Sequence, residues 1–205
     1  MEHRNARRGS RVARLGTAVM LLFLPILAAC GAGQAVNDTF GLSAAPVVKG
    51  RASASRQILV PEPTALKALD SEQIVVRLSS SEIQYLARSQ WSDRLPRMVQ
   101  SALVRTFENT GRVGGVGKPG EGLAIDFQVI TDIRAFEVAT DGRSTATVEI
   151  FAKIVDDRNG TVKAQRLFRA LSPVSGSGNA QFVRALDQAF SKVAAEIVDW
   201  TLGAI

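Results

Sequence analysis

Two segments of the chain repeat apolar residues at the three- and four-residue spacing of an amphipathic helix. The first runs from Trp91 to Thr110 and the second from Asn179 to Leu202. This spacing gathers apolar side chains on one face, which we expect to pack against a core. In the first helix we expect Asp93 to cap the start, Pro96 to lie in the first turn and Gly111 to end the helix.

Between Gly122 and Leu171 the pattern changes to an alternation of apolar and polar residues. Ile125 to Val129 and Thr145 to Ile154 each alternate with a period of two, which predicts strands with one buried face and one polar face. The dipeptides Asp141-Gly142 and Asn159-Gly160 fall between the strands, and such pairs favour tight hairpin turns. The segment is therefore predicted to be an antiparallel meander of three strands.

Shorter apolar runs precede the first helix. Gln57 to Val60 and Gln73 to Leu78 are rich in Ile and Val and are predicted strands, and Thr39 to Leu42 is a third, shorter candidate. Residues 44–56 are rich in Ala, Ser, Gly and Pro, which predicts a loop. The whole pattern predicts a single α/β (mixed α+β), three-layer-like domain, with a mixed sheet that ends in the meander and is packed by two amphipathic helices.

The first 29 residues have the three zones of a bacterial export signal. Five arginines precede an apolar run from Leu15 to Leu27, and the small residues Ala28 and Ala29 then lead to Cys30. The run is shorter than the about 20 residues that span a bilayer. Leu27, Ala28 and Ala29 satisfy a lipobox, so we expect cleavage between Ala29 and Cys30 and lipidation of Cys30.

Two alternatives to lipidation are an ordinary cleaved signal with an incidental cysteine and a buried free thiol. Cys30 is the only cysteine and lies in Gly- and Ala-rich sequence outside any periodic core segment, which favours lipidation. Gly31 follows it, so the aspartate that commonly retains lipoproteins in the inner membrane is absent there. We therefore expect the mature protein on the periplasmic face of the outer membrane.

Cleavage before Cys30 would also change the composition. It would leave 176 residues, enough for one domain, with 20 basic and 18 acidic side chains, so the charge of +6 belongs largely to the signal. Nucleic-acid binding then has little support. The only histidine, His3, would be lost, which excludes Ser-His-Asp, Cys-His and His/Cys zinc sites within one mature chain. We expect no catalytic residue, cofactor or metal.

Two motifs in the sequence are candidates for chemical sites. Residues 115–120 match the dinucleotide-binding glycine pattern, but they follow a helix and precede a strand, so a flexible connector is expected instead. A pair of carboxylates for glycoside hydrolysis is the second candidate, although nothing in the sequence places two at a working separation. Its members are Asp126, Asp132, Glu149, Asp156 and Asp157.

Three aromatic residues are candidates for a ligand surface. Trp91, Trp200 and Tyr85 have rings that stack on sugars or line an acyl groove, but the two tryptophans are expected in the core or at helix ends.

The order of motifs resembles the ABC-type transport auxiliary lipoproteins. The similarity begins with Val60-Pro61-Glu62-Pro63 and Gln73-Ile74-Val75-Val76, and it continues through Trp91-Ser92-Asp93-Arg94 to the terminal Ile197-Val198-Asp199-Trp200. Together with Cys30 it spans nearly the whole mature chain. The resemblance implies a mixed sheet packed by helices and a lipoprotein that works with an ABC permease, its ATPase and a periplasmic MCE-domain protein. It implies lipid trafficking between the two membranes without catalysis by this subunit.

We therefore expect a signal peptide at residues 1–29, a lipidated tether at 30–37 and the auxiliary domain at 38–205. The expected function is that of a docking adaptor anchored at the outer membrane. The sequence leaves open whether the protein forms a homo-oligomer. Two alternatives remain. One is a structural lipoprotein that assists outer-membrane barrel or lipopolysaccharide assembly, and the other is a periplasmic hydrolase based on carboxylates.

Overall fold

The structure is a computed structural model that describes residues 37–45 and 53–205. The predicted signal peptide, its cleavage site at Ala29 and the lipidation site Cys30 lie outside the described residues. Residues 37–205 form one compact unit.

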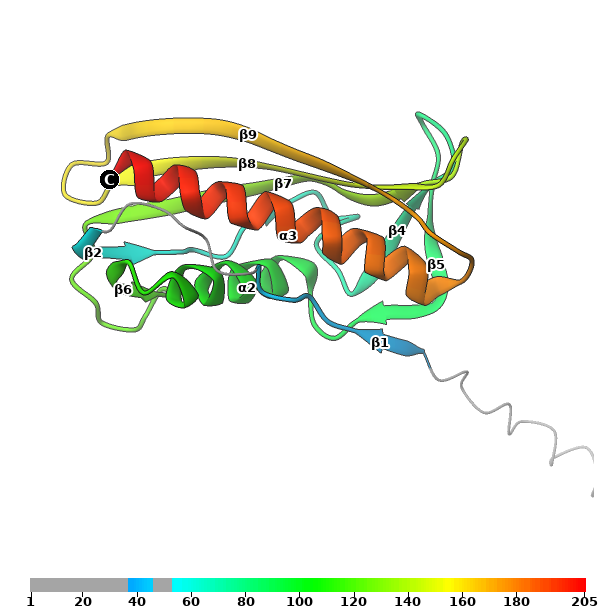
Figure 1. Cartoon of the computed structure of the whole chain (residues 1–205), viewed down its shortest axis with the longest axis horizontal. Coiled ribbons are helices and arrows are strands. Elements are labelled where there is room, and N and C mark those ends of the chain that lie inside the picture. Colours follow the sequence, from blue (N-terminus) through cyan, green and yellow to red (C-terminus); the bar gives the residue numbers. More distant parts are fainter. Residues whose placement is uncertain (1–36, 46–52) are drawn as a thin grey trace, which may run out of the picture. The chain divides into compact units, whose positions relative to one another are not determined.

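Nine strands form one mixed sheet, and two helices pack against it (Figure 1), as the sequence pattern predicts. The strands are β1 (Asp38–Phe40), β2 (Ser53–Leu59), β3 (Thr64–Ala65), β4 (Gln73–Arg77), β5 (Ile83–Trp91), β6 (Val113–Gly117), β7 (Phe127–Ala139), β8 (Thr145–Asp156) and β9 (Val162–Pro173). The helices are α2 (Leu95–Thr110) and α3 (Asn179–Ala204).

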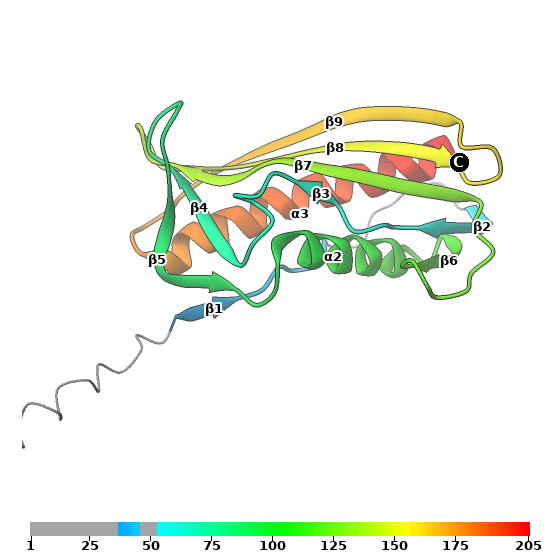
Figure 2. The same cartoon turned by 180° about the vertical axis from the view of Figure 1, so that it is seen from behind.

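The antiparallel meander is confirmed. β7 pairs with β8 and β8 with β9, and the turns between them contain Asp141-Gly142 and Asn159-Gly160. Along β8 every second side chain from Ala146 to Ile154 is buried, while the intervening positions are half-buried. α3 contacts all three strands and covers their buried face (Figure 2).

β7 joins the meander to the N-terminal half of the chain. One edge pairs with β8 along its length, and the other edge pairs in parallel with β2, β3 and β4 in succession. β2 continues in parallel to β6, whereas β4 continues to β5 and then to β1. Parallel pairing needs long connections, and the path from β2 to its parallel partner β6 runs through β3, β4, β5 and α2.

The first predicted helix begins later than expected. Trp91 ends β5, and α2 starts at Leu95 with Arg94 as its N-cap, so the prediction that Asp93 caps the helix is wrong. The Asp93 carboxylate accepts the N–H of Arg94 at 2.7 Å instead of an N–H inside the helix. Pro96 in the first turn and Gly111 at the end are confirmed, and Gly111 has the left-handed φ of 59°.

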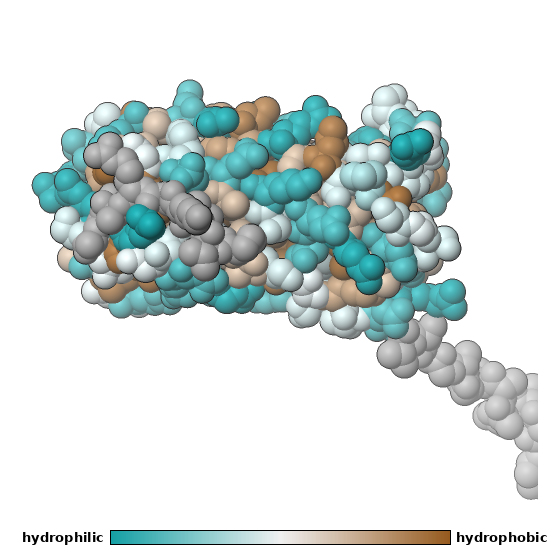
Figure 3. All heavy atoms as spheres, in the orientation of Figure 1, coloured by the Kyte–Doolittle hydropathy of each residue, from teal (hydrophilic) through white to brown (hydrophobic). Residues whose placement is uncertain are grey.

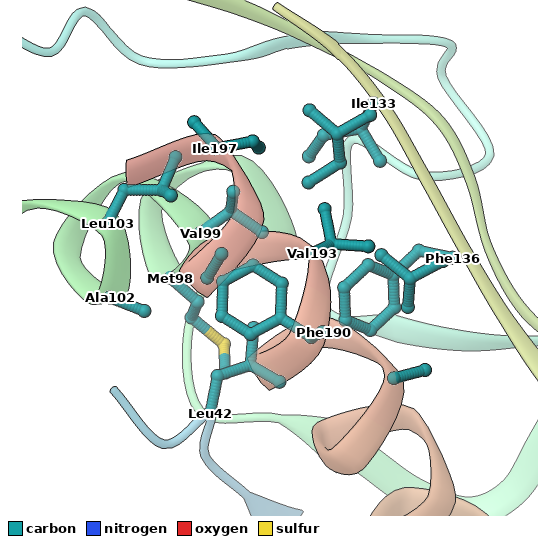
Figure 4. Close-up of a cluster of buried hydrophobic side chains, with 14 of the residues drawn as sticks. Leu42, Met98, Val99, Ala102, Leu103, Ile133, Phe136, Phe190, Val193 and Ile197 are labelled. Carbon is teal, nitrogen blue, oxygen red and sulfur yellow. The ribbon is translucent and has the colours of Figure 1, made fainter. Parts of the chain in front are cut away.

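One continuous apolar core fills the space between the sheet and the helices (Figure 4). Phe190 of α3 lies against Phe136 of β7 with ring centroids 5.9 Å apart. Trp91 packs edge-on against the same Phe136 at 5.7 Å. α3 also contacts α2, so its apolar residues reach both the sheet and the other helix. Both amphipathic faces therefore belong to the core, as their spacing predicts.

Four strand assignments differ from the sequence expectations, and one of them is the two-residue β3, which had no counterpart. β2 starts at Ser53, inside the segment predicted as a loop over 44–56. β6 occupies 113–117, so part of the expected flexible connector is a strand that pairs with β2. β5 had no counterpart, because its side chains from Ile83 to Arg88 are mostly exposed and give no periodic pattern.

Candidate functional site

The five candidate carboxylates lie along the meander, and each has a neighbouring basic or polar group as a hydrogen-bond or ion-pair partner. Asp132 accepts the Thr64 hydroxyl at 2.9 Å, and Glu149 lies 3.8 Å from Arg169. Asp157 accepts the Gln128 amide, and Asp156 accepts the N–H of Arg158 at 3.0 Å. No group of three His, Cys, Asp or Glu side chains in the described part of the chain is arranged to hold a metal ion.

Asp126 is the most strongly held carboxylate of this set. Its Oδ2 accepts the backbone N–H of Gln57 at 3.0 Å, and its Oδ1 lies 3.5 Å from Arg56 and 3.3 Å from Arg158. The hydrogen bond from Gln57 lowers the pKa of Asp126, partial burial opposes this, and the two arginines lower it further. Asp126 is thus an ionised group that ties the β2 strand and the β8–β9 turn to the start of β7.

A second ion pair was not singled out from the sequence. Arg77 of β4 donates to both carboxylate oxygens of Glu137 on β7, including an Nη2 to Oε2 bond of 2.8 Å. This bond raises the pKa of Arg77, although burial opposes the shift. The two residues are 60 positions apart, and no local pattern could have joined them. The pair stabilises the parallel contact between β4 and β7.

The glycine segment does not form a phosphate site. Gly117 ends β6, and a Cβ atom there would meet the Leu123 side chain at 2.4 Å and the Glu121 carboxylate at 2.7 Å. Glu121 accepts the backbone N–H of Lys118 at 2.9 Å, and the Lys118 ammonium donates to the Ser101 hydroxyl. The segment therefore folds back on itself, and its lysine is engaged with α2.

The candidate aromatic residues do not converge on one surface. Trp91 is fully buried, and Trp200 is half-buried against Phe168 with centroids 5.3 Å apart, so both serve packing as expected. Tyr85 lies six positions before Trp91 on the same strand, β5, but it is 43% exposed whereas Trp91 is buried in the core.

The open edge of β9 is the most extended feature that could bind a partner. Among the described residues β9 pairs with β8 alone, so the other edge of this 12-residue strand is free (Figure 1). β9 contains Lys163, Arg166 and Arg169 and no acidic residue. Leu167 and Leu171 are 43% and 52% exposed. An edge of this kind offers backbone donors and acceptors to an added strand.

The register shows which amides of β9 point outward. Val174 donates its N–H to Ser144 at 3.0 Å, and antiparallel strands alternate with a period of two. The odd-numbered amides, including those of Leu167 and Arg169, therefore point to the free edge. Pro173 falls in this set, so its missing N–H costs no bond to β8.

The face of the molecule that carries α3 shows no single apolar area. Outside the residues drawn in grey, apolar side chains are interspersed with polar ones (Figure 3). Neither helix within the described ranges is long and apolar enough to cross a membrane.

Comparisons with known proteins identify the relatives of the chain. A protein of Bradyrhizobium diazoefficiens described as uncharacterized is 32% identical over 151 residues, which are 74% of this chain and 41% of that relative. The chain thus spans less than half the length of this relative. The crystal structure of a Xanthomonas campestris protein is 28% identical with a TM-score of 0.75, covering 81% of this chain and 95% of that one.

A Chlamydia trachomatis structure shares the fold at 11% identity, with a TM-score of 0.55 and coverage of 74% of this chain and 98% of that one. The family described as the ABC-type transport auxiliary lipoprotein component matches residues 40–198, which include every strand from β2 to β9, all of α2 and most of α3. The match covers most of the chain and indicates the cell envelope as its location. The chain therefore belongs to the ABC-type transport auxiliary lipoprotein family.

Proposed function

We propose that the protein is a non-catalytic lipoprotein subunit of an ABC/MCE-type system that moves lipids between the inner and outer membranes. In this proposal residues 1–29 are removed, Cys30 carries the lipid, residues 30–37 form the tether and residues 38–205 form the docking domain. The anchor lies in the periplasmic face of the outer membrane. Family membership supports the transport role, and a role as an adaptor requires a surface for the partner.

The observation that carries the proposal is the free edge of β9, with three cations and no acidic residue. The favoured occupant is an extended acidic segment of the MCE-domain protein, which would add a strand antiparallel or parallel to β9. Main-chain bonds to the outward amides would supply affinity, and the cations would select acidic side chains. Pairing of β9 with a second β9 brings two cationic strands together and is disfavoured.

The catalytic alternative lacks such support. Each of the five candidate carboxylates has a basic or polar partner within the fold. These contacts join neighbouring strands and turns of the sheet. A lipoprotein that assists barrel or lipopolysaccharide assembly would use the same lipid anchor. The partner recovered from membranes therefore distinguishes this assembly role from the transport role.

The test uses full-length protein crosslinked in membranes and then purified, with the MCE-domain protein of the same system as the readout. Leu167→Pro removes an amide that points to the free edge, whereas Leu167→Ser keeps it and changes the side chain. We expect Leu167→Pro to lose the MCE-domain protein and Leu167→Ser to retain it. Equal recovery by both variants would contradict docking at β9.

A second proline variant serves as the control for a general loss of folding. Ala170→Pro removes an amide that points to β8, so it should lower the melting temperature, while Leu167→Pro should not lower it comparably. Recovery of barrel-assembly factors without the MCE-domain protein would overturn the proposed function and favour the assembly role.

A further inference from the structure

The β4–β5 hairpin carries apolar side chains on its solvent-exposed face. In an amphipathic strand that face is normally polar. Ile83 is 38% exposed and Tyr85 is 43% exposed. The two are separated by one residue and therefore share a face of β5, whereas Leu86 has the opposite direction and packs against the core. By contrast, the half-buried positions of β8 are mostly polar. The chain's only tyrosine thus lies on a surface without a partner in the described residues.

This hairpin lies at the end of the domain where the described chain begins. Asp38 of β1 pairs with Ser89 of β5, and both views show β1 and the hairpin at the same end (Figures 1 and 2). Tyr85 lies four positions before Ser89, a path of at most about 14 Å. Since neighbouring strands are about 4.8 Å apart, Tyr85 is within about 20 Å of Asp38 for any bend of β5.

The proposed anchor limits the distance of this end from the membrane. Cys30 lies seven positions before Asn37, and a fully extended chain of that length spans at most about 25 Å. The other end of the meander is far away, because β8 has 12 residues and spans about 40 Å. In this proposal the end with β1 and the hairpin is therefore the part of the domain nearest the tether.

We propose that Ile83 and Tyr85 form a second membrane contact beside the lipidated cysteine, an inference that rests on the proposed anchoring. The occupant is the lipid surface itself. Tyrosine suits this place because its ring is apolar and its hydroxyl is polar, which is the combination found at membrane interfaces. Together with the lipid, the hairpin fixes the orientation of the domain and directs the β8–β9 turn away from the membrane.

The lone cysteine makes a site-specific test available. Once Cys30 carries lipid the chain has no thiol, so Ile83→Cys, Tyr85→Cys and Thr161→Cys each provide one attachment site for an environment-sensitive fluorophore. Thr161 is exposed beside the β8–β9 turn and is the matched control. The full-length lipidated variants are placed in vesicles of phosphatidylethanolamine and phosphatidylglycerol, with and without a spin-labelled lipid that quenches on contact.

We expect labels at positions 83 and 85 to shift to shorter emission wavelengths and lose most of their emission to the quencher, while the label at 161 keeps its emission. Equal quenching at all three positions, or protection of position 85 only after a partner protein is added, would overturn the membrane contact. A separate control reports on the anchor: if the unsubstituted protein takes up the label at Cys30, lipidation fails independently of the hairpin.

Discussion

At the residue scale, the groups that hold the fold together come from distant parts of the sequence. The sequence presents Asp126 as a candidate carboxylate, but its two arginine partners lie 70 and 32 positions away. The Arg77–Glu137 pair spans 60 positions. Sequence spacing reports which residues share a helix face or a strand face, and it carries no information on which strands become neighbours. The residue types of the site were therefore predictable, whereas their partners were not.

Asp126→Asn tests this view through the pH dependence of stability. The Gln57 N–H and the two arginines lower the pKa of folded Asp126 below its unfolded value of about 3.9. Ionised Asp126 therefore stabilises the fold above that value, and the contribution disappears as pH falls through the lower, folded pKa. Asparagine removes it at every pH.

The measurement is the melting temperature by circular dichroism from neutral to strongly acidic pH. We expect the variant to melt below the wild type at neutral pH and the difference to narrow with acidification below the unfolded pKa. Two curves that remain parallel into strong acid would show that the charge of Asp126 makes no contribution.

At the element scale, local pattern was sufficient wherever one face of an element is buried. α3 and the three strands of the meander agree with their periodicity, because the core lies on one side of each. β5 and β6 lack this asymmetry. β5 is largely exposed from Ile83 to Arg88, and β6 contains three glycines that give no side chain to the pattern. Their places in the sheet depend on parallel pairing across long connections, which periodicity does not encode.

Gly111→Ala tests how α2 ends. Gly111 has φ of 59° and ψ of 23°, and a Cβ atom there would meet nothing within 4 Å. The cost of alanine is therefore the left-handed backbone itself, about 1 to 2 kcal/mol in the free energy of unfolding. Gly142→Ala is the matched control, because its site is equally open and its φ is outside the left-handed range.

Denaturant unfolding of both variants provides the measurement. We expect the midpoint to fall for Gly111→Ala and to stay near the wild type for Gly142→Ala. Equal midpoints would mean that the end of α2 relaxes to another backbone conformation at no cost.

At the scale of the whole molecule, the proposals assign different tasks to the two ends of the domain. The end near Asn37 carries the tether and the exposed hairpin, whereas β9 runs along the sheet between the two ends. The family match and the fold support an envelope lipoprotein. The proposed location of the anchor in the outer membrane depends on Cys30 and Gly31, which precede the described domain. Substitutions at these two residues therefore test it.

Gly31→Asp tests the outer-membrane assignment. The proposal depends on Gly31 following the lipidated cysteine, because an aspartate at this position commonly retains lipoproteins in the inner membrane. We expect the aspartate variant to move to the inner-membrane fraction in density-gradient separation, and Gly31→Ser to stay with the outer membrane.

Cys30→Ser should leave both membranes, because a polar side chain replaces the acyl chains and each buried CH₂ contributes about 0.8 kcal/mol to anchoring. Retention of Cys30→Ser in either membrane would show that attachment does not depend on the cysteine, and an unmoved Gly31→Asp would show that sorting does not depend on residue 31.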